Sequence, residues 1–508
     1  MYNLEPSYEE DPIGGVARFA AVMSGLREDL AAQGRAPPML IFSGDFVGPS
    51  LMSSVTKGAH MIEAINQLGV HFATFGNHEF DYGYQSLINR LDGKDDDVAD
   101  ADFGSYDYPA TTTQWIATNI TEGKTGLPVG GEKYAKRTVL TTWGSGSDKE
   151  IKVGLLAVSE NWLPNCTQLK TDELVYADFI KEARSAATTL RSQGAELVLA
   201  ICHNRLEQDR QLAKEVPEID VILGGHDHFY KNDRKNRLIK SGEEFRWLSH
   251  VRVEISPSCQ VSYYVDRYDV DKEITPDPGI EKMCEKYHNL MQRKFSKVVA
   301  TSKVALDPRD DVVRYHEGVL PNFVCDACAE DFSEKEGLQS ADFCLLSGYT
   351  FAGKEAVAPG NVTLGDLTTV LRPNKLVVLK LTGEQVRKSL ELGAKRLPDE
   401  CGSLFHVSSR LKYTINLHPA DPSTKKPVRP TVKDLLFDNQ PIQLDKEYVV
   451  GVTDSTAEGK FGFDWMATAP RVIEEEHAAQ ILDVVLWYCA RHKNEPVNPS
   501  LGRITISN

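Results

Sequence analysis

The chain has 508 residues, which is too long for one hydrophobic core, so we expect two or three domains. Its net charge of −16 leaves no basic footprint for a nucleic-acid polymer, although bound cations would still admit a small phosphorylated molecule. No apolar run approaches the length of a membrane-spanning helix, and neither end resembles a signal peptide or an anchor signal, so we expect no membrane partner. Nine cysteines without regular spacing indicate free thiols and predict a cytoplasmic protein, whose oligomeric state stays open.

The first predicted element is an amphipathic helix over residues 14–34, where a glycine ends the apolar pattern. Residues 39–83 then predict a strand, a helix and a second strand. The apolar runs 39–42 and 70–75 suit buried strands, and apolar residues recur at helical spacing over 61–68. A βαβ unit places its functional loops at the carboxyl ends of parallel strands, so the polar residues after each run are candidates for a site.

The rest of the first domain alternates strands with helices. We predict strands at residues 115–120, 151–159, 196–202 and 219–223. A helix is predicted at 178–193, and two antiparallel strands at 247–256 and 260–270 close the domain.

The segment Thr-Pro-Asp-Pro-Gly at residues 275–279 marks a linker. The predicted organisation is a first domain over 1–275, a linker helix over 276–297 and a second domain over 298–508. The second domain mixes both element types, with helices at 386–395 and 477–492 and strands at 376–381 and 448–453. The predicted fold class is therefore α/β (α+β) in both domains.

Five polar residues follow apolar runs of the first domain, namely Asp45, Asn77, His203, His226 and His228. Because each follows a predicted strand, we expect all five to gather at one edge of a parallel sheet. A carboxylate, an amide oxygen and imidazoles favour zinc, manganese, iron or cobalt, and magnesium is left open. Two such ions about 3.5–4 Å apart clamp the attacking and leaving oxygens of a phosphate ester and supply a hydroxide nucleophile.

His78 directly follows the candidate ligand Asn77, and its ring can protonate a leaving oxygen or stabilise charge in the transition state. Asp81 lies three residues further on and can orient that ring. Taken singly, each motif also suits a structural histidine or an ordinary turn. GNHEFD and GGHDH together, each after a buried strand, favour a metallophosphoesterase.

Four segments resemble the motifs of a known family. SGDFVGPS resembles its Gly-Asp motif, FATFGNHEFDYG its Gly-Asn-His-Glu motif, LAICHN its middle histidine and VILGGHDH its Gly-His-x-His motif. The first domain is similar to the calcineurin-like metallophosphoesterases, and the whole chain resembles the 5′-nucleotidase family. The resemblance implies a four-layer αββα domain, a second α/β domain that binds the substrate, and hydrolysis of a nucleoside 5′-monophosphate or related nucleotide to nucleoside and phosphate.

The resemblance also implies a role for each candidate residue. Asp45 would bridge two metal ions; Asn77, His203 and His226 would complete one of them, and His228 would serve the other. His78 with Asp81 would form the catalytic dyad.

The chain departs from the family at its start. The family opens with a strand that ends in Asp-x-His, and both polar residues bind the first metal. Tyr2 stands at the histidine position here, and the aspartate would lie before Met1. We expect the first strand to be missing because the start is truncated, since every later ligand is present. The alternative is a pseudoenzyme or ligand-binding protein on the same fold, with a degraded first metal site.

The second departure concerns substrate recognition. Arg396 matches a family arginine, although a helix-end cation is a competing interpretation. Phe463 matches a base-stacking ring and Phe405 lies beside the position of another, with a buried core ring as the competing interpretation. Ala352 and Phe461 replace a family arginine and aspartate. The substrate is therefore a nucleotide, a nucleotide sugar or another phosphomonoester.

Overall fold

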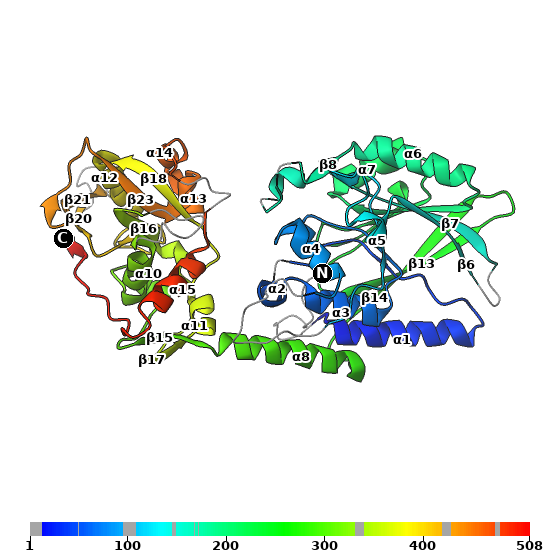
Figure 1. Cartoon of the computed structure of the whole chain (residues 1–508), viewed down its shortest axis with the longest axis horizontal. Helices are drawn as coiled ribbons and strands as arrows, with labels where there is room; N and C mark the ends of the chain where they lie inside the picture. The colour runs from blue at the N-terminus through cyan, green and yellow to red at the C-terminus, as the bar shows by residue number, and fades with distance from the viewer. Residues whose placement is uncertain are drawn as a thin grey trace. The chain divides into compact units, whose positions relative to one another are not determined.

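The computed structural model describes residues 13–48, 50–94, 108–144, 149–166, 168–170, 172–330, 340–418, 428–472 and 478–507. The chain divides into two units, Met1–Met291 and Gln292–Asn508, each of which mixes helices with sheets (Figure 1). The helix α8, Pro278–Phe295, crosses this division. The expected departure at Tyr2 lies outside the described residues.

The first unit contains a four-stranded and a six-stranded sheet. The four-stranded sheet is parallel, in the order β1-β2-β3-β5, with bounds Ile41–Phe42, Phe72–Ala73, Gln114–Ile116 and Ala135–Lys136. The six-stranded sheet has the order β11-β12-β10-β9-β7-β6, with bounds Tyr230–Asp233, Leu238–Ser241, Val221–Gly224, Leu197–His203, Ile151–Ser159 and Thr138–Trp143. Its four central strands are parallel, and each end strand is antiparallel to its neighbour.

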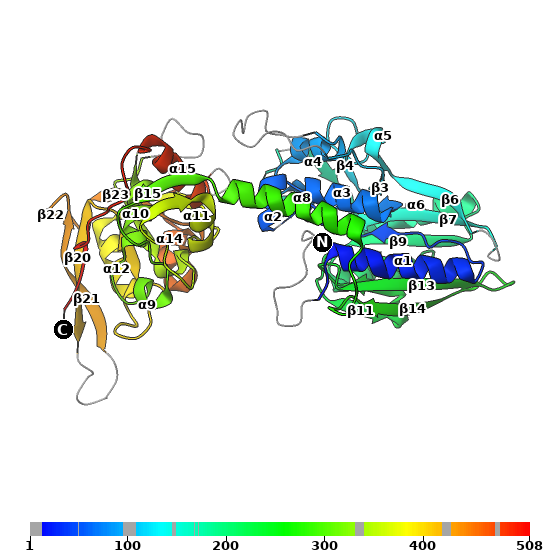
Figure 2. The same ribbon diagram turned by 90° about the horizontal axis from the view of Figure 1, so that it is seen from below.

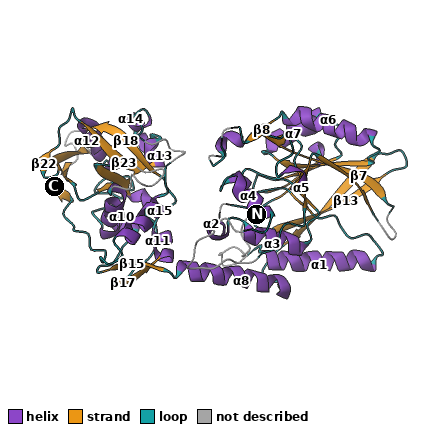
Figure 3. Ribbon diagram, in the orientation of Figure 1, coloured by secondary structure: helices purple, strands orange, loops and turns teal. Residues whose placement is uncertain are grey.

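The two sheets pack face to face around one apolar layer. Phe72 and Ile116 from the four-stranded sheet are in one buried cluster with Leu155, Leu199 and Ile239 from the six-stranded sheet. The other face of the six-stranded sheet packs against α6 and α7. Helices α6 and α7 lie on one side of the strands, and α1 and α3 on the other (Figure 3). The predicted four-layer αββα arrangement is confirmed.

A side-chain cap defines the start of α6, one of the helices of this unit. Their bounds are α1 Val16–Ala32, α2 Leu51–Thr56, α3 Ala59–Leu68, α4 Tyr84–Leu91, α5 Gly131–Tyr134, α6 Phe179–Ser192 and α7 Leu206–Glu215. The side chain of Asp178 accepts the backbone N–H of Lys181 and so caps α6, whose face with Ala183, Ala187 and Leu190 is buried. Among the described residues, no helix combines the length and the apolar character that crossing a membrane requires.

Two further strand pairs complete the unit. The predicted antiparallel pair is present as β13 Trp247–Ile255 and β14 Val261–Asp269. A short antiparallel pair joins β4 Ile120–Glu122 and β8 Leu174–Tyr176. Helix α1 lies beside β13 (Figure 2).

A cavity of about 770 Å³ that is partly open to solvent lies in the first unit. Its wall includes consecutive residues of β1 and its flanks, 37–45, and of β13, 247–253. Alternate side chains of β7, β9 and β10 and one apolar stripe of α1 also line it. Strand β1 ends the four-stranded order, so one of its backbone edges has no strand partner among the described residues.

The second unit contains two four-stranded sheets and one strand pair. Their orders are β18-β23-β16-β19, with bounds Leu376–Thr382, Glu447–Thr453, Phe343–Ser347 and Phe405–Val407, and β22-β21-β20-β24, with bounds Gln440–Pro441, Val428–Phe437, Leu411–His418 and Ile504–Ser507. The pair is β15 Val298–Ser302 with β17 Gly360–Thr363. Its helices are α9 Asp310–Val313, α10 Val319–Ala329, α11 Leu364–Val370, α12 Gly383–Gly393, α13 Asp454–Ala457, α14 Asp464–Ala467 and α15 Ile481–Arg491. Two apolar cores, one containing Phe343 and the other Val324, hold this unit together.

Candidate metal-binding active site

Four of the five predicted ligands meet at the carboxyl ends of parallel strands, but these strands belong to two sheets. Asp45 and Asn77 follow β1 and β2 of the four-stranded sheet, whereas His203 ends β9 and His226 follows β10 of the six-stranded sheet. The expectation of one sheet edge is therefore corrected: the facing sheets each supply two of the four side chains. Their sandwich packing brings the four loops together.

A glycine permits the close approach of two of these loops. A Cβ atom on Gly76 would clash with Asp45 Oδ1 and would lie 2.6 Å from His203 Nε2. Any side chain here would displace both candidate ligands. This is the physical reason for a glycine directly before Asn77.

Asp45 is a buried carboxylate on a strained backbone. Its φ of 63° lies in the left-handed region, which costs free energy for a residue other than glycine. Its Oδ1 accepts the backbone N–H of His78 at 3.1 Å, and its Oδ2 lies 3.0 Å from His203 Nε2. Burial acts to raise the pKa of this carboxyl, but His203 and His78 outweigh it and hold the pKa well below its usual range.

His203 is fully buried and oriented by the neighbouring loop. Its Nδ1–H donates to the Ser43 carbonyl at 2.7 Å, which leaves Nε2 to face Asp45. Burial acts to lower the pKa of His203, whereas Asp45 raises it, and the net direction is upward. A backbone carbonyl that fixes the other ring nitrogen is the usual partner of a metal-binding histidine.

His226 completes the cluster together with Asn77. Its Nδ1 lies 3.2 Å from Asn77 Oδ1 and 3.3 Å from His203 Nε2. The φ of His226 is 70°, so it shares the left-handed strain of Asp45. Burial and the neighbouring His203 lower the pKa of His226 and favour the neutral ring that binds a metal.

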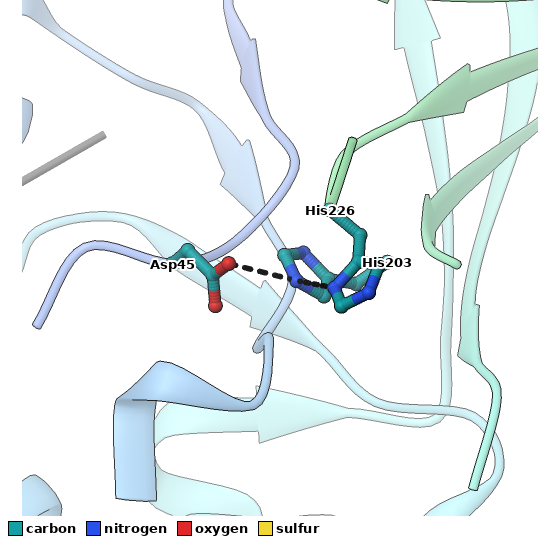
Figure 4. Close-up of side chains that lie close together, drawn as sticks. All are labelled: Asp45, His203 and His226. Atoms are coloured by element: carbon teal, nitrogen blue, oxygen red, sulfur yellow. Dashed lines mark hydrogen bonds and ion pairs between the residues drawn. The ribbon is translucent and has the colours of Figure 1, made fainter. Parts of the chain in front are cut away.

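The spacing of these atoms fits a metal ion. One ligand atom from each of Asp45, His203 and His226 lies within 4.8 Å of the others, and Figure 4 shows the carboxylate facing the two imidazoles. Ligands about 2.0–2.1 Å from a tetrahedral ion are separated by roughly 3.3 Å. The observed separations of 3.0–3.3 Å between neighbouring donor atoms match that value.

His78 and Asp81 form the predicted pair. Nδ1 of His78 lies 2.9 Å from Asp81 Oδ2, and about 30% of each side chain is exposed, at 29% and 32%. Burial acts to lower the pKa of His78, but Asp81 and Asp45 raise it above its ordinary value. The ring therefore holds its proton to higher pH than a free histidine.

His228 is not part of this cluster. Its side chain is 52% exposed, and Nδ1 lies 2.8 Å from Glu243 Oε2. Its expected role as ligand of a second ion stays a prediction.

Glu79 is an organising residue that the sequence reasoning missed. Its buried carboxylate accepts backbone N–H groups from Asp45, Phe46 and Gly76 and thus joins the loops after β1 and β2. Burial and the Asp45 charge raise the pKa of Glu79. Its place inside the GNHE motif was a signal, but its burial is visible only in the fold.

Arg205 and Glu160 also lie at the site and were not predicted. Arg205 Nη1 donates to both oxygens of Glu160 at 3.0 Å, and Glu160 Oε1 is 3.7 Å from His226 Nε2. The arginine side chain is 60% exposed. The Arg205 guanidinium therefore lies beside the cluster and faces solvent, and no sequence motif predicted its place there.

The three predicted substrate-binding residues lie in the second unit in different environments. Arg396 is exposed, just beyond α12. Phe405 and Phe463 are 0% and 1% exposed and pack on each other in the core, with ring centroids 5.1 Å apart. Stacking of a base on either ring would require it to leave the core. The exposed ring is that of Phe461, which stacks on Tyr349 at 5.2 Å.

Comparisons with known proteins agree with this architecture. Residues 11–230 match the family Calcineurin-like phosphoesterase, and residues 298–468 match the family 5′-nucleotidase, C-terminal domain. A 5′-nucleotidase from Bos taurus is 22% identical over 97% of this chain and 86% of the bovine one.

Two solved structures share the fold over 99% of this chain and 97% of their own. They are a 5′-nucleotidase precursor from Thermus thermophilus, with a TM-score of 0.54 and 21% identity, and an NAD nucleotidase from Haemophilus influenzae, with 0.58 and 18%. Both matched domains lie in one chain, and the similarity to a 5′-nucleotidase extends over nearly all of it. The chain is thus similar to 5′-nucleotidases, with a match to the calcineurin-like phosphoesterases in its N-terminal part and to the 5′-nucleotidase C-terminal domain in its C-terminal part.

Proposed function

We propose that this protein hydrolyses a nucleoside 5′-monophosphate or a related nucleotide to nucleoside and phosphate, with two divalent metal ions as cofactors. The observation that carries the proposal is the convergence of Asp45, Asn77, His203 and His226 beside the His78–Asp81 pair. The families matched by both domains are hydrolases that act on phosphate monoesters. The bovine relative, which bears the name 5′-nucleotidase, supports a nucleotide as the substrate.

The residues at the site suit zinc, manganese, iron or cobalt, with magnesium left open. Asp45, Asn77, His203 and His226 would hold one ion, and Asp45 with His228 would contribute to a second. When bound, such ions polarise the phosphoryl group and make water a stronger nucleophile.

The chain's own residues handle the proton of the leaving group. Water adds to phosphorus, the bond between phosphorus and the ester oxygen breaks, and that oxygen needs a proton. Asp81 holds the Nδ1–H of His78, so Nε2 is the atom that can give up a proton. Despite burial, the hydrogen bond to Asp81 raises the pKa of His78 and thus favours the protonated ring, whose charge also stabilises negative charge on the phosphoryl oxygens.

Phosphate release from nucleoside monophosphates, nucleotide sugars and simple phosphomonoesters, with Mn²⁺, Zn²⁺ or Co²⁺, tests the proposal. We expect release by the unaltered protein and a loss of about a hundredfold in Asn77→Ala, the upper end of what the loss of a metal-site partner costs. The matched control is His71→Ala. His71 directly precedes β2, and its Nδ1 accepts the backbone N–H of Leu40. It therefore lies at the opposite end of the strand that leads to Asn77. This variant should keep its activity.

Release that is equal in the unaltered protein and Asn77→Ala would reject the proposal. In that case the pseudoenzyme alternative would account for the fold. The proposed cytoplasmic location is a separate question, and it is supported by nine cysteines that are all free thiols.

A further inference from the structure

A lysine with no exposed surface lies directly behind the candidate metal site. Lys240 is on β12, opposite Gly224 of the parallel neighbour β10, and its side chain is 0% exposed. A buried ammonium is costly unless several oxygen atoms surround it. The structure supplies those oxygen atoms.

Two of the oxygen atoms are backbone carbonyls next to candidate ligands. Lys240 Nζ donates to the carbonyl of Asn204 at 2.8 Å and to that of Gly225 at 2.6 Å. Asn204 follows His203, and Gly225 precedes His226. One atom thus fixes the loops after β9 and β10 relative to each other, at the residues adjoining both histidines.

Two carboxylate oxygen atoms balance the positive charge of Lys240. Asp209 Oδ2 lies 2.7 Å from Nζ and is also 0% exposed, and Asp227 Oδ2 lies at 3.3 Å. Asn204 Nδ2 donates to the other oxygen of Asp209 at 2.9 Å. The pair, the two loops and Asn204 form one buried network at the carboxyl ends of two strands.

A glycine makes room for this network. A Cβ atom on Gly224 would lie 2.7 Å from Asp209 Oδ2 and 3.0 Å from Lys240 Nζ. The absence of a side chain at this position therefore lets the ion pair sit against β10.

We infer that Lys240 is a positioning residue for the metal centre, which holds His203 and His226 in ligand geometry through the carbonyls of Asn204 and Gly225. The inference rests on the proposed function, because it assumes that these histidines bind a metal. Partners one step removed from the ligands set the orientation of those ligands, and their loss typically weakens metal binding about 10–100-fold.

The test variant is the double substitution Lys240→Met with Asp209→Asn. Methionine removes the donors to both carbonyls at similar volume, and asparagine avoids an unpaired buried carboxylate while still accepting from Asn204. Co²⁺ alone is titrated into metal-free protein, with its visible absorption and the heat of binding as readouts. We expect Co²⁺ affinity to fall about 10–100-fold and the absorption band to change.

A second ion pair provides the matched control. Arg191 Nη2 lies 2.6 Å from Asp220 Oδ2, and Arg191 Nη1 donates to the carbonyls of Ala195 and Glu196 at 3.1 and 3.0 Å. Asp220 Oδ2 also accepts the backbone N–H of Val198 near the start of β9, and Asp220 itself directly precedes β10. The pair thus lies at the ends of both strands that are away from the candidate site. Arg191→Met with Asp220→Asn should lower the melting temperature but leave the affinity for Co²⁺ and its spectrum unchanged.

Gly224→Ala is a second test variant, for use in the same Co²⁺ titration if the double variant does not fold. Its Cβ displaces the ion pair without removing it, and Gly154→Ala on β7, where a Cβ would lie 3.0 Å from Leu190 Cβ, matches the crowding away from the site. We expect weaker Co²⁺ binding only in Gly224→Ala.

The outcomes separate the inference from the proposed function. If the unaltered protein binds no Co²⁺, or His203→Ala binds it equally well, the proposed metal centre fails. If the unaltered protein binds Co²⁺ through His203 and the folded Lys240 variant shows the same affinity and spectrum, the positioning role is overturned.

Discussion

At the scale of single residues, the site combines a cluster of candidate metal ligands with an exposed arginine, Arg205. Arg205 is held by Glu160 close to His226, yet its side chain is 60% exposed. A guanidinium in this position is suited to bind the phosphate oxygens of a substrate. It would thus contribute to substrate binding rather than to proton transfer.

We therefore predict that Arg205→Ala raises KM for a nucleoside monophosphate about tenfold, with a smaller change in kcat, because a hydrogen bond to a charged group contributes about 1.5–3 kcal/mol. Steady-state kinetics measure this effect. Arg210→Ala is the control, since Arg210 lies on α7, the helix that Arg205 directly precedes, and pairs with Asp233. An unchanged KM in Arg205→Ala would remove this arginine from the site.

A second prediction concerns how Asp209 makes the free energy of unfolding depend on pH. Burial raises the pKa of this carboxyl to about 6, despite the opposing effect of Lys240. The folded state then binds the proton more tightly than the unfolded chain, so stability falls as pH rises from about 4 to 6. A difference of about two pKa units corresponds to roughly 3 kcal/mol.

Urea unfolding between pH 4 and 7 measures this slope. In Lys240→Met with Asp209→Asn, the part of the slope between pH 4 and 6 should become flatter. The Arg191→Met with Asp220→Asn variant keeps Asp209 and should retain that part. A slope that is identical in the Asp209 variant and the unaltered protein would show that other groups cause it.

At the scale of elements, the sequence predicted most strands and helices because their apolar periods are long. The predicted strand at 151–159 coincides with β7, and the predicted helix at 178–193 with α6 and its two caps. The run at 39–42 forms only two strand residues, since its register with β2 pairs only Ile41 with Phe72 and Phe42 with Ala73. Apolar runs reveal burial, but they do not reveal where a ladder ends.

The site was less predictable than the elements. Motif residues such as Asp45 and His203 stand directly after apolar runs, so their convergence followed from the rule for parallel strands. The roles of Glu79, Arg205 and Lys240 depend on which loops face each other, and no local pattern contains that information. Phe405 and Phe463 show the converse, because a resemblance in sequence did not indicate that both rings are buried in the core.

The cavity beside β1 leads to a prediction about packing. Its volume is about 770 Å³, and exposed residues such as Arg35, Pro257 and Cys259 lie at its rim, so water can enter it. Consecutive residues of β1 and β13 line the space. Apolar side chains that face it therefore lack packing partners on that side.

We predict that Val253→Phe raises the melting temperature of the 508-residue chain, because the larger ring fills space that lacks packing partners. Val253 is half-buried on β13 and lines the cavity. If another part of the protein occupied this space, the same ring would clash and lower the melting temperature. Thermal unfolding of the variant and of the unaltered protein decides between these outcomes.

At the scale of the whole molecule, each unit has its own hydrophobic core and can respond separately to ligands. The candidate ligands Asp45, Asn77, His203 and His226 all belong to the unit Met1–Met291. A metal that binds only the folded state stabilises the unit that holds it, by about 2.7 kcal/mol at one hundred times the Kd. The second unit, Gln292–Asn508, contributes none of these four side chains.

We therefore predict two transitions in scanning calorimetry, of which only one depends on metal. Mn²⁺ or Co²⁺ at one hundred times its Kd should raise that transition by roughly 5 °C, and a chelator should reverse the shift. His203→Ala should abolish the shift and leave the other transition in place, which assigns the responding transition to the first unit. A metal-dependent shift of both transitions, or a single transition that includes both units, would show that the two cores unfold as one cooperative body. The measurement thus tests the metal centre without any assumption about the substrate.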